Sequence, residues 1–320
     1  MKKIFFRNDF SNDDPAEEFF NFQISSWNFA KANYSALEKA QFKKFVFPNA
    51  TVFVQHNPAR AISTFAETAR ETIADRKCFL CDENLYPEQI GLAINENFTM
   101  LVNPYPIVSR HFTIKFNKHV PQKISDNFGD FLASARFLGE KYFVLYNGPD
   151  CGASVPEHRH FQAGIASELP IINEIKAYCE REREFIERRI LTREVGKNIH
   201  RVYDGLRAYY LLCNENEDEL TANFFELFRE LERRFPSERE TKINLLLFVY
   251  RGKLTLGVFP RKNHRPQTFY DEDGIKISPA TLDYGGLMVA PRKEDFEKID
   301  KKGIKKIFGD VAFEASELFK

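Results

Sequence analysis

The chain has 320 residues, which is enough for one large domain or two medium-sized domains with a substantial core. Lys plus Arg and Asp plus Glu each number 46, so the formal net charge is zero, and this balance argues against non-specific nucleic-acid binding. The sequence shows neither a signal peptide nor an apolar run near the ~20 residues that cross a bilayer. We therefore expect a cytoplasmic protein with no membrane and no nucleic acid among its partners.

The first part of the chain predicts helices followed by strands. Residues 1–45 have the mixed apolar and charged pattern of amphipathic helices. Two β-rich stretches at 45–47 and 51–55 predict a pair of strands. A loop that includes Arg60 comes next, and from the residues alone Arg60 is interpreted equally well as an ordinary surface arginine.

Five cysteines, of which Cys78 and Cys81 form a C-x-x-C pair, indicate metal or redox chemistry rather than a disulfide framework. A redox dithiol would need a strand before it and a helix starting at it, whereas residues 82–87 predict a knuckle and a loop. Zinc prefers four nitrogen or sulfur ligands in a tetrahedron, and C-x-x-C places two thiolates at a suitable separation. His111 and His119, on either side of a predicted strand, are both candidates for a third ligand.

A helix over 123–140 and a strand over 141–146 are predicted before a turn that carries two glycines. The turn reads Asn-Gly-Pro-Asp-Cys-Gly-Ala-Ser over residues 147–154. Glycines let such a turn adopt conformations in which backbone N–H groups can meet an anion.

His158, His160 and Gln162 follow the turn at intervals of two. In an extended segment these side chains share one face, while Phe161 and Ala163 project from the other face and can anchor a strand in a core. A neutral imidazole is a capable nucleophile toward phosphorus when its other ring nitrogen donates a hydrogen bond that fixes the tautomer. Two histidines on a solvated strand are the alternative interpretation of the same residues.

The second half of the chain follows a similar order of elements, although no repeat is detectable in the sequence. The charged residues from 168 to about 195 predict an exposed helix, and a second helix is predicted over 218–235. Apolar stretches at 242–250 and 254–261 predict a hairpin. Helices between paired strands indicate an α+β protein with a mainly antiparallel sheet.

The segment from Tyr146 to Gln162 resembles the active-site signature of the histidine-triad superfamily, and more narrowly the transferase branch in which Gln replaces the third histidine. Gly152-Ala153-Ser154 ahead of His-x-His-x-Gln is similar to the diadenosine tetraphosphate phosphorylases. The same motif is similar to galactose-1-phosphate uridylyltransferase and the GDP-hexose phosphorylases. The resemblance is strong over residues 50–165 and weaker over 240–295.

This resemblance implies a histidine-triad-like α+β fold with a mainly antiparallel sheet, flanking helices and two similar halves. The first half, 1–170, would be catalytic and carry the zinc site, and 171–320 would form the second half. Asn244 and Phe259-Pro260-Arg261 are the residues that resemble the second half of the diadenosine tetraphosphate phosphorylases.

The resemblance also implies a nucleotidyltransferase or phosphorylase. His160 would attack the α-phosphate of a nucleoside diphosphate derivative to give a nucleotidyl-histidine, and Gln162 would donate its amide to a phosphate oxygen. A phosphate-bearing acceptor, either inorganic phosphate or a sugar phosphate, would then remove the nucleotidyl group. The implied substrate-binding residues are Asn147, Gly148, Gly152, Ser154 and Arg60.

The base and the leaving group stay open at this point. The neighbourhood of Ser154 favours a dinucleoside polyphosphate, whereas the C-x-x-C zinc pattern favours a sugar nucleotide. The related transferases are often dimers, so a homodimer is one expectation for the assembly. A zinc-stapled nucleotide-binding protein without turnover is an alternative, and so is a hydrolase, which Gln162 in place of a histidine disfavours.

For the metal, resemblance to the zinc-binding uridylyltransferases favours His119 over His111 as third ligand and His158 as fourth. His111 is then expected to be a buried, hydrogen-bonded structural histidine. Zinc on Cys78, Cys81, His119 and His158 would be structural, because four protein ligands leave no open position for water.

Overall fold

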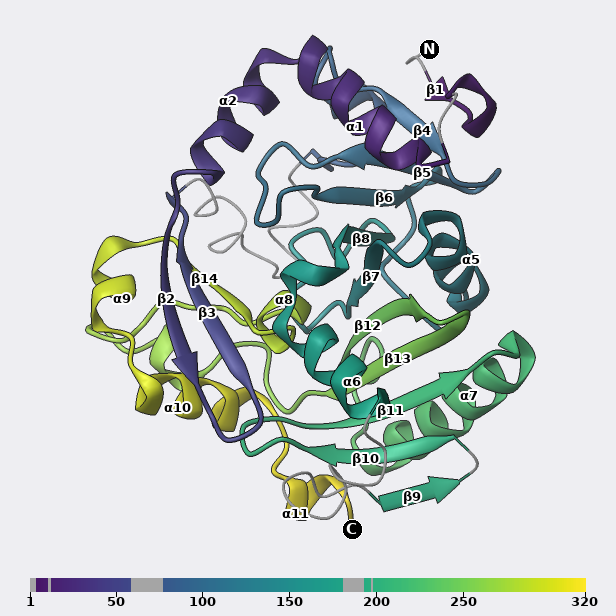
Figure 1. Cartoon of the computed structure of the whole chain (residues 1–320). Helices are drawn as coiled ribbons and strands as arrows, with labels where there is room; N and C mark the ends of the chain where they lie inside the picture. Colours follow the sequence, from purple (N-terminus) through teal and green to yellow (C-terminus); the bar gives the residue numbers. More distant parts are fainter. Residues whose placement is uncertain (1–3, 11–12, 59–76, 181–192, 197) are drawn as a thin grey trace.

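The computed structural model describes residues 4–10, 13–58, 77–180, 193–196 and 198–320, and Figure 1 shows its ribbon. One sheet of eleven strands runs through the molecule in the order β1-β4-β5-β6-β8-β7-β12-β13-β11-β10-β9. Its neighbouring strands are antiparallel apart from β1 and β4. The strands are β1 (Ile4–Phe5), β4 (Gly91–Ala93), β5 (Phe98–Val102), β6 (Phe112–Phe116), β7 (Tyr142–Asn147), β8 (His160–Ile165), β9 (Arg193–Gly196), β10 (Ile199–Tyr203), β11 (Ala208–Asn214), β12 (Ile243–Tyr250) and β13 (Lys253–Pro260).

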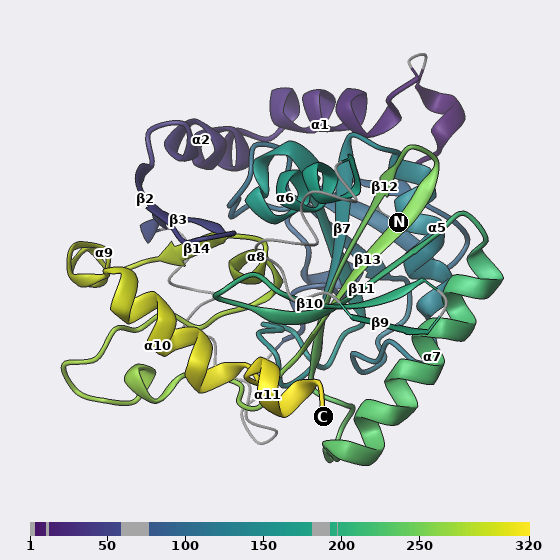
Figure 2. The ribbon, with the colours of Figure 1, turned by 60° about the horizontal axis from the view of Figure 1, so that its bottom comes forward.

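A separate sheet contains the strands β2 (Gln41–Val46), β3 (Thr51–His56) and β14 (Leu287–Ala290). The strand β3 pairs with β2 antiparallel and with β14 parallel, so an early and a late segment of the chain meet in this sheet. The predicted strand pair near residue 50 is thus confirmed, but it belongs to this small sheet. In Figures 1 and 2 the small sheet lies with α9 and α10 on one side of the molecule, and α7 lies on the other.

Helices flank both sheets, which confirms the expected α+β class. They are α1 (Pro15–Ser26), α2 (Asn28–Leu37), α5 (Phe128–Leu138), α6 (Pro170–Glu180), α7 (Glu217–Arg234), α8 (Thr281–Tyr284), α9 (Lys293–Lys298), α10 (Lys301–Val311) and α11 (Ala315–Leu318). Short 3-10 turns lie at η1 (Arg7–Asp9), η3 (Asp82–Asn84), η4 (Ala166–Glu168) and η5 (Gln267–Phe269). Within the described ranges, each helix is too short or too polar to span a bilayer.

The large sheet contains two halves of the same topology. In the first half the hairpin β5–β6, the helix α5 and the hairpin β7–β8 give the strand order 5-6-8-7. In the second half β10–β11, α7 and β12–β13 give the order 10-11-13-12. The halves join where β7 pairs with β12, and Asn147 lies opposite Asn244. The expected pair of similar halves is confirmed, and the boundary at residue 170 between two domains stays a prediction.

The two faces of the large sheet bury separate cores. One core lies under α1, α5 and α7, where the rings of Phe128 and Phe224 stack with centroids 4.0 Å apart. The other core lies under α6, α8, α10 and the small sheet. Burial of this much apolar surface is the main stabilising contribution to the fold.

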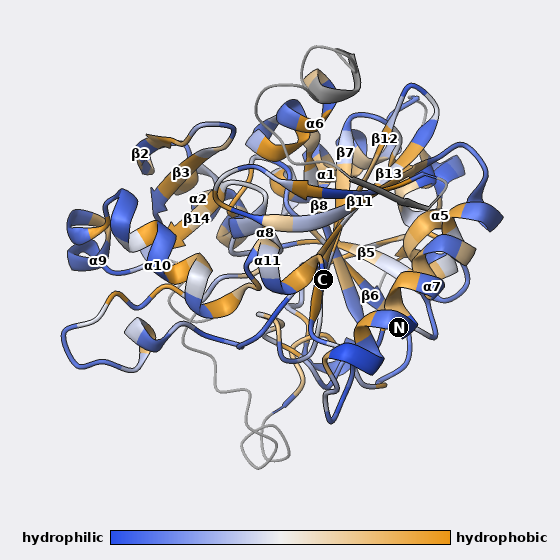
Figure 3. Ribbon diagram, turned by 90° about the horizontal axis from the view of Figure 1, so that it is seen from below, coloured by the Kyte–Doolittle hydropathy of each residue, from blue (hydrophilic) through white to orange (hydrophobic). Residues whose placement is uncertain are grey.

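The helix α7 illustrates how the sequence specifies these layers. The Asn216 side chain accepts hydrogen bonds from the N–H groups of Asp218 and Glu219, which caps the N-terminus. Its buried residues are spaced for a helix, and Figure 3 shows hydrophobic residues on one side and hydrophilic residues on the other. The expected helix from 168 to about 195 is only partly correct, because α6 ends at Glu180 and Arg193–Gly196 is a strand that pairs with β10. Residues 181–192 lie outside the described part.

Candidate functional site

The strand β8 places the motif residues His160 and Gln162 on one face of the sheet. Phe161 and Ala163 are buried in the core under α5, as the alternation predicts. Gln162 pairs with Leu145, which belongs to the other core, so Gln162 and His160 face that side. His158 differs from the expectation, since β8 begins at His160 and His158 lies in the segment before it. Its side chain turns toward the cysteines instead.

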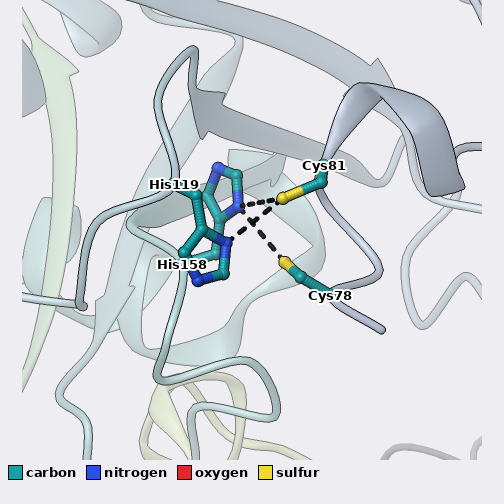
Figure 4. A group of neighbouring side chains, drawn as sticks. All are labelled: Cys78, Cys81, His119 and His158. Atoms are coloured by element: carbon teal, nitrogen blue, oxygen red, sulfur yellow. Dashed lines mark hydrogen bonds between the residues drawn. The ribbon is translucent and has the colours of Figure 1, made fainter. Parts of the chain in front are cut away.

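The four predicted metal ligands lie together (Figure 4). The ligand atoms of Cys78, Cys81, His119 and His158 are all within 4.8 Å of one another. Cys78 Sγ lies 3.2 Å from His158 Nδ1, and Cys81 Sγ lies 3.2 Å from His119 Nδ1. Around a tetrahedral zinc ion, two such ligand atoms lie about 3.3–3.8 Å apart. His111 lies outside this cluster, in the hydrogen bond described below.

Two further observations test whether a metal fits here. His158 Nε2 is 2.8 Å from the Phe116 carbonyl, so Nε2 carries the proton and Nδ1 keeps a lone pair toward the sulfur atoms. Burial, with Cys78 adding to it, raises the pKa of the Cys81 thiol to about 12. The Cys81 thiol would be neutral at pH 7 without a cation, and a divalent metal reverses that preference. The four residues therefore fit a structural metal site.

His160 is 3 % exposed, and its ring has one defined tautomer. Nδ1 lies 2.8 Å from the carbonyl oxygen of His158, which can only accept, so Nδ1 carries the proton. Nε2 consequently presents a lone pair, and it makes no hydrogen bond within the part of the chain that the structure describes. Burial lowers the pKa of His160, so the ring is neutral.

The side chain of Gln122 holds the backbone of His160. Its Oε1 accepts from the His160 N–H at 2.8 Å, and its Nε2 donates to the His160 carbonyl at 2.9 Å and to the Asn147 carbonyl at 3.0 Å. The β7–β8 ladder ends at the pair Leu145 and Gln162, so the Gln122 amide continues the pairing where the strands separate. Sequence reasoning missed Gln122, because a lone glutamine before a helix carries no pattern that indicates this contact.

The Gln162 amide is also oriented by a buried partner. The N–H of Ile107 donates to His111 Nδ1 at 3.3 Å, so the proton of His111 is on Nε2. That nitrogen lies 2.9 Å from Gln162 Oε1 and donates to it. The Tyr34 hydroxyl donates to the His111 carbonyl at 2.9 Å and fixes the backbone there. His111 is the buried, hydrogen-bonded histidine that the sequence predicts.

The two glycines of the turn are required by packing. A Cβ atom on Gly148 would lie 2.8 Å from the Ile243 carbonyl, whereas one on Gly152 would lie 2.6 Å from the Ala280 Cβ. Gly152 also has φ +91°, a conformation that other residues rarely adopt. The Gly148 N–H donates to the Ile243 carbonyl and is therefore engaged. Among the described residues, the N–H groups of Gly152 and Ala153 donate to no other protein atom.

Asn147 connects the turn to the second half of the chain. Its Oδ1 accepts from Asn244 Nδ2 at 2.8 Å and from the Thr281 N–H at 2.9 Å. Asn244 also donates to the Cys151 carbonyl at 2.8 Å. The side-chain oxygen of Asn147 therefore already accepts hydrogen bonds from other residues of the protein. Roles of Asn147, Gly148, Gly152 and the half-buried Ser154 toward a substrate stay predictions, and Arg60 lies outside the described residues.

The side chain of Arg261 fixes the position of Asn244, the partner of Asn147. It is 1 % exposed, and it donates from Nη1 to Asn244 Oδ1 at 2.7 Å. Its other N–H groups donate to the carbonyl oxygens of Val311, Pro279, Asn263 and His264. All five guanidinium N–H groups have acceptors, so a buried and fully hydrogen-bonded Arg261 holds Asn244, which in turn holds the turn.

Comparison with known structures identifies the architecture. Yeast Ap4A phosphorylase Apa2 matches with a TM-score of 0.58 at 17% identity, over 89% of this chain and 96% of Apa2. The chain has the histidine-triad-like fold of Apa2. The same enzyme in complex with Ap4A matches with a TM-score of 0.53 at 18% identity, over 90% of this chain and 97% of that chain. The AMP complex gives a TM-score of 0.53 at 16% identity, over 91% and 96%.

The Apa2-like fold confirms the fold that the sequence resemblance implies. A family model described as "Domain of unknown function (DUF4922)" matches residues 19–165, which include β2 to β8 and the whole motif. No curated protein matches the chain in sequence.

Proposed function

We propose that the chain is a nucleotidyltransferase of the phosphorylase type, acting through a nucleotidyl-histidine on His160. The observation that carries the proposal is the tautomer of His160, whose Nδ1–H donates to the His158 carbonyl and leaves the Nε2 lone pair for attack. The Apa2-like fold supports the same assignment.

The reaction has two displacements. In the first, Nε2 of His160 attacks the α-phosphorus, a P–N bond forms, and the P–O bond to the leaving phosphate breaks. Positive charge develops on the imidazole, and the carbonyl of His158, 2.8 Å from Nδ1, stabilises it. In the second, an oxygen of the acceptor attacks phosphorus, a P–O bond forms, and the P–N bond breaks.

The non-bridging oxygens of the α-phosphate need donors on the same face. Gln162 offers its amide NH₂, because His111 occupies its Oε1. The N–H groups of Gly152 and Ala153, with the Ser154 hydroxyl, are the other donors in this proposal. Fixed donors of this kind stabilise charge that develops in a transition state.

We assign a structural zinc ion to Cys78, Cys81, His119 and His158, with no catalytic step. When bound, the metal supplies a cross-link between the knuckle at 78–84, the loop after β6 and the segment that leads into β8. Those residues then hold the His158 carbonyl, which orients the ring of His160.

A dinucleoside polyphosphate is the first substrate class to test, and a sugar nucleotide is the second. Apa2, which shares the fold, has been solved with Ap4A and with AMP. Inorganic phosphate is the acceptor in this proposal. Release of the first product before the acceptor binds predicts ping-pong kinetics.

Trapping the intermediate tests the proposal. The protein is mixed with Ap4A in the absence of phosphate, denatured at alkaline pH and analysed by mass spectrometry for an AMP group on His160. His160→Ala should bear no such group, whereas His200→Ala, which changes a histidine on β10, should retain it. An adduct that persists in His160→Ala, or turnover without any adduct, would contradict the assignment.

A further inference from the structure

A buried carboxylate connects the two halves of the chain close to the proposed reaction centre. Glu240 lies in the connection between α7 and β12, in the second half, and it is 5 % exposed. Its Oε1 accepts hydrogen bonds from the N–H groups of Ile124 at 2.7 Å and Ser125 at 3.3 Å. Its Oε2 accepts from the Tyr146 hydroxyl. All three donors belong to the first half, and the proposed reaction gives this carboxylate no task.

The two N–H groups that Glu240 holds belong to the segment that carries Gln122. Residues 120–125 form neither a helix nor a strand, so individual hydrogen bonds determine the course of this segment. On one side, the Val120 carbonyl accepts from the Arg159 N–H at 2.8 Å, and the Gln122 N–H donates to the Pro156 carbonyl at 2.9 Å. On the other side, just before α5, Glu240 supplies the acceptor for two successive N–H groups.

Loss of this carboxylate would leave the Ile124 N–H buried without an acceptor. A buried donor without a partner is costly, so the segment would move until water or another acceptor reached it. Gln122 lies two residues away and would move with the segment. Its side chain makes two hydrogen bonds to the backbone of His160, so the displacement would reach the nucleophile.

We infer that Glu240 is a positioning residue for His160, acting through residues 122–125 and the amide of Gln122. The expected effect on rate rests on the proposed function, whereas the orientation of the His160 ring can be measured without turnover. Moving a nucleophile by about 1 Å can slow a reaction by about 100-fold, so support of this kind matters for the rate. The second half of the chain would thus help to hold the reaction centre of the first half.

Replacement by glutamine should preserve the contact. Glutamine offers a carbonyl oxygen to the two N–H groups, and its NH₂ group can donate to the Tyr146 hydroxyl oxygen. Glu240→Gln should therefore keep kcat within about threefold of the unchanged protein. Glu240→Leu has a similar size and offers no acceptor. Its kcat should fall at least about tenfold, with little change in the affinity for AMP.

A double variant shows whether Glu240 acts through Gln122. Glu240→Leu combined with Gln122→Leu should be no slower than Gln122→Leu alone, because residues that act in one chain of contacts are not additive. Gln23→Leu is the matched control. Gln23 on α1 is buried and accepts from the Ile90 N–H at 2.8 Å, next to β4. This control should lose stability and keep its kcat. Fully multiplicative losses in the double variant, or an equal loss of kcat in Gln23→Leu, would overturn the inference.

The ring of His160 gives a readout that does not need turnover. In spectra of protein labelled with ¹⁵N-histidine, the His160 signals are assigned by their absence in His160→Ala. They should show one tautomer, with the proton on Nδ1, in the unchanged protein, in Glu240→Gln and in Gln23→Leu. Glu240→Leu should shift them toward a mixture of tautomers, and unchanged signals there overturn the inference.

The two proposals fail separately. An unchanged protein that forms no AMP adduct contradicts the proposed function alone, and the spectra of Glu240→Leu still decide the positioning role. If Glu240→Leu fails to fold, Glu240→Asp takes its place, because the shorter side chain withdraws the carboxylate from the two N–H groups. Unchanged His160 signals in Glu240→Asp would then overturn the inference.

Discussion

His111 Nε2 donates to Gln162 Oε1 over 2.9 Å, and this single hydrogen bond determines which end of the Gln162 amide is left for another partner. The direction is not ambiguous, because the Ile107 N–H occupies His111 Nδ1. A glutamine with its oxygen held in this way is a donor toward the open side of the strand, which is what an anionic substrate requires.

The variant His111→Leu should therefore lower kcat by about 10–100-fold, the loss of one hydrogen bond to a charged group. Without His111 the amide can rotate and present its oxygen to the phosphate. The check is steady-state kinetics with His111→Leu, Gln162→Ala and the double variant. The double variant should be no slower than Gln162→Ala alone, and fully multiplicative losses would show that His111 acts elsewhere.

Gln122→Leu should lower kcat with little change in the affinity for AMP, because Gln122 places the backbone of His160. The informative background is His160→Gly supplied with a nucleoside phosphorimidazolide, in which the imidazole arrives with the substrate. If Gln122 positions only the histidine, Gln122→Leu should have almost no effect there. A loss of equal size in both backgrounds would assign Gln122 to the architecture of the turn instead.

Metal analysis should find one zinc per chain, and chelation should lower the melting temperature by at least ~5 °C. Cys78→Ser should lose the metal and show a similar loss of stability, since a structural zinc ion contributes directly to folding. Cys213→Ser removes a cysteine of β11, outside the cluster, and should keep the metal. A metal-free protein with an unchanged melting temperature is the contrary result.

Glu240 predicts a pH dependence of stability. Burial raises the pKa of this carboxyl from 4.5 to about 7, against the hydrogen bonds from Tyr146, Ile124 and Ser125. Since the folded pKa lies above the unfolded one, the stabilising contribution is full below about pH 4.5 and is lost as the pH rises through 7. The loss is at most about 3 kcal/mol.

Urea unfolding at several pH values checks this contribution. Glu240→Gln should flatten the decline in unfolding free energy between pH 4.5 and 7, whereas Glu226→Gln, an exposed change on α7, should leave it as it is. Some slope should remain, because burial also raises the pKa of Asp283 to about 7. A profile unchanged by Glu240→Gln would place the titration elsewhere.

Cys78, Cys81 and the motif residues could be predicted from the sequence because they have local signatures, whereas His119 and His158 are chosen as metal ligands from the family resemblance. C-x-x-C and His-x-His-x-Gln specify residue types at fixed spacing, and the alternation of Phe161 and Ala163 with Gln162 predicts the face of the strand. Gln122 could not be predicted, because its contacts join residues far apart in the chain. The pairing of β7 with β12 could not be predicted either, since the sequence of an apolar strand does not specify which strand lies beside it.

The repeated topology of the large sheet has a consequence for stoichiometry. In the first half, residues 148–159 connect β7 to β8, and this long connection contains the whole turn and His158. In the second half, Arg251-Gly252 alone connects β12 to β13. A tight hairpin has no room for a phosphate, so the proposed function predicts one reaction centre in the duplicated architecture and not two. The amount of AMP bound covalently should therefore reach a plateau at one equivalent for each polypeptide.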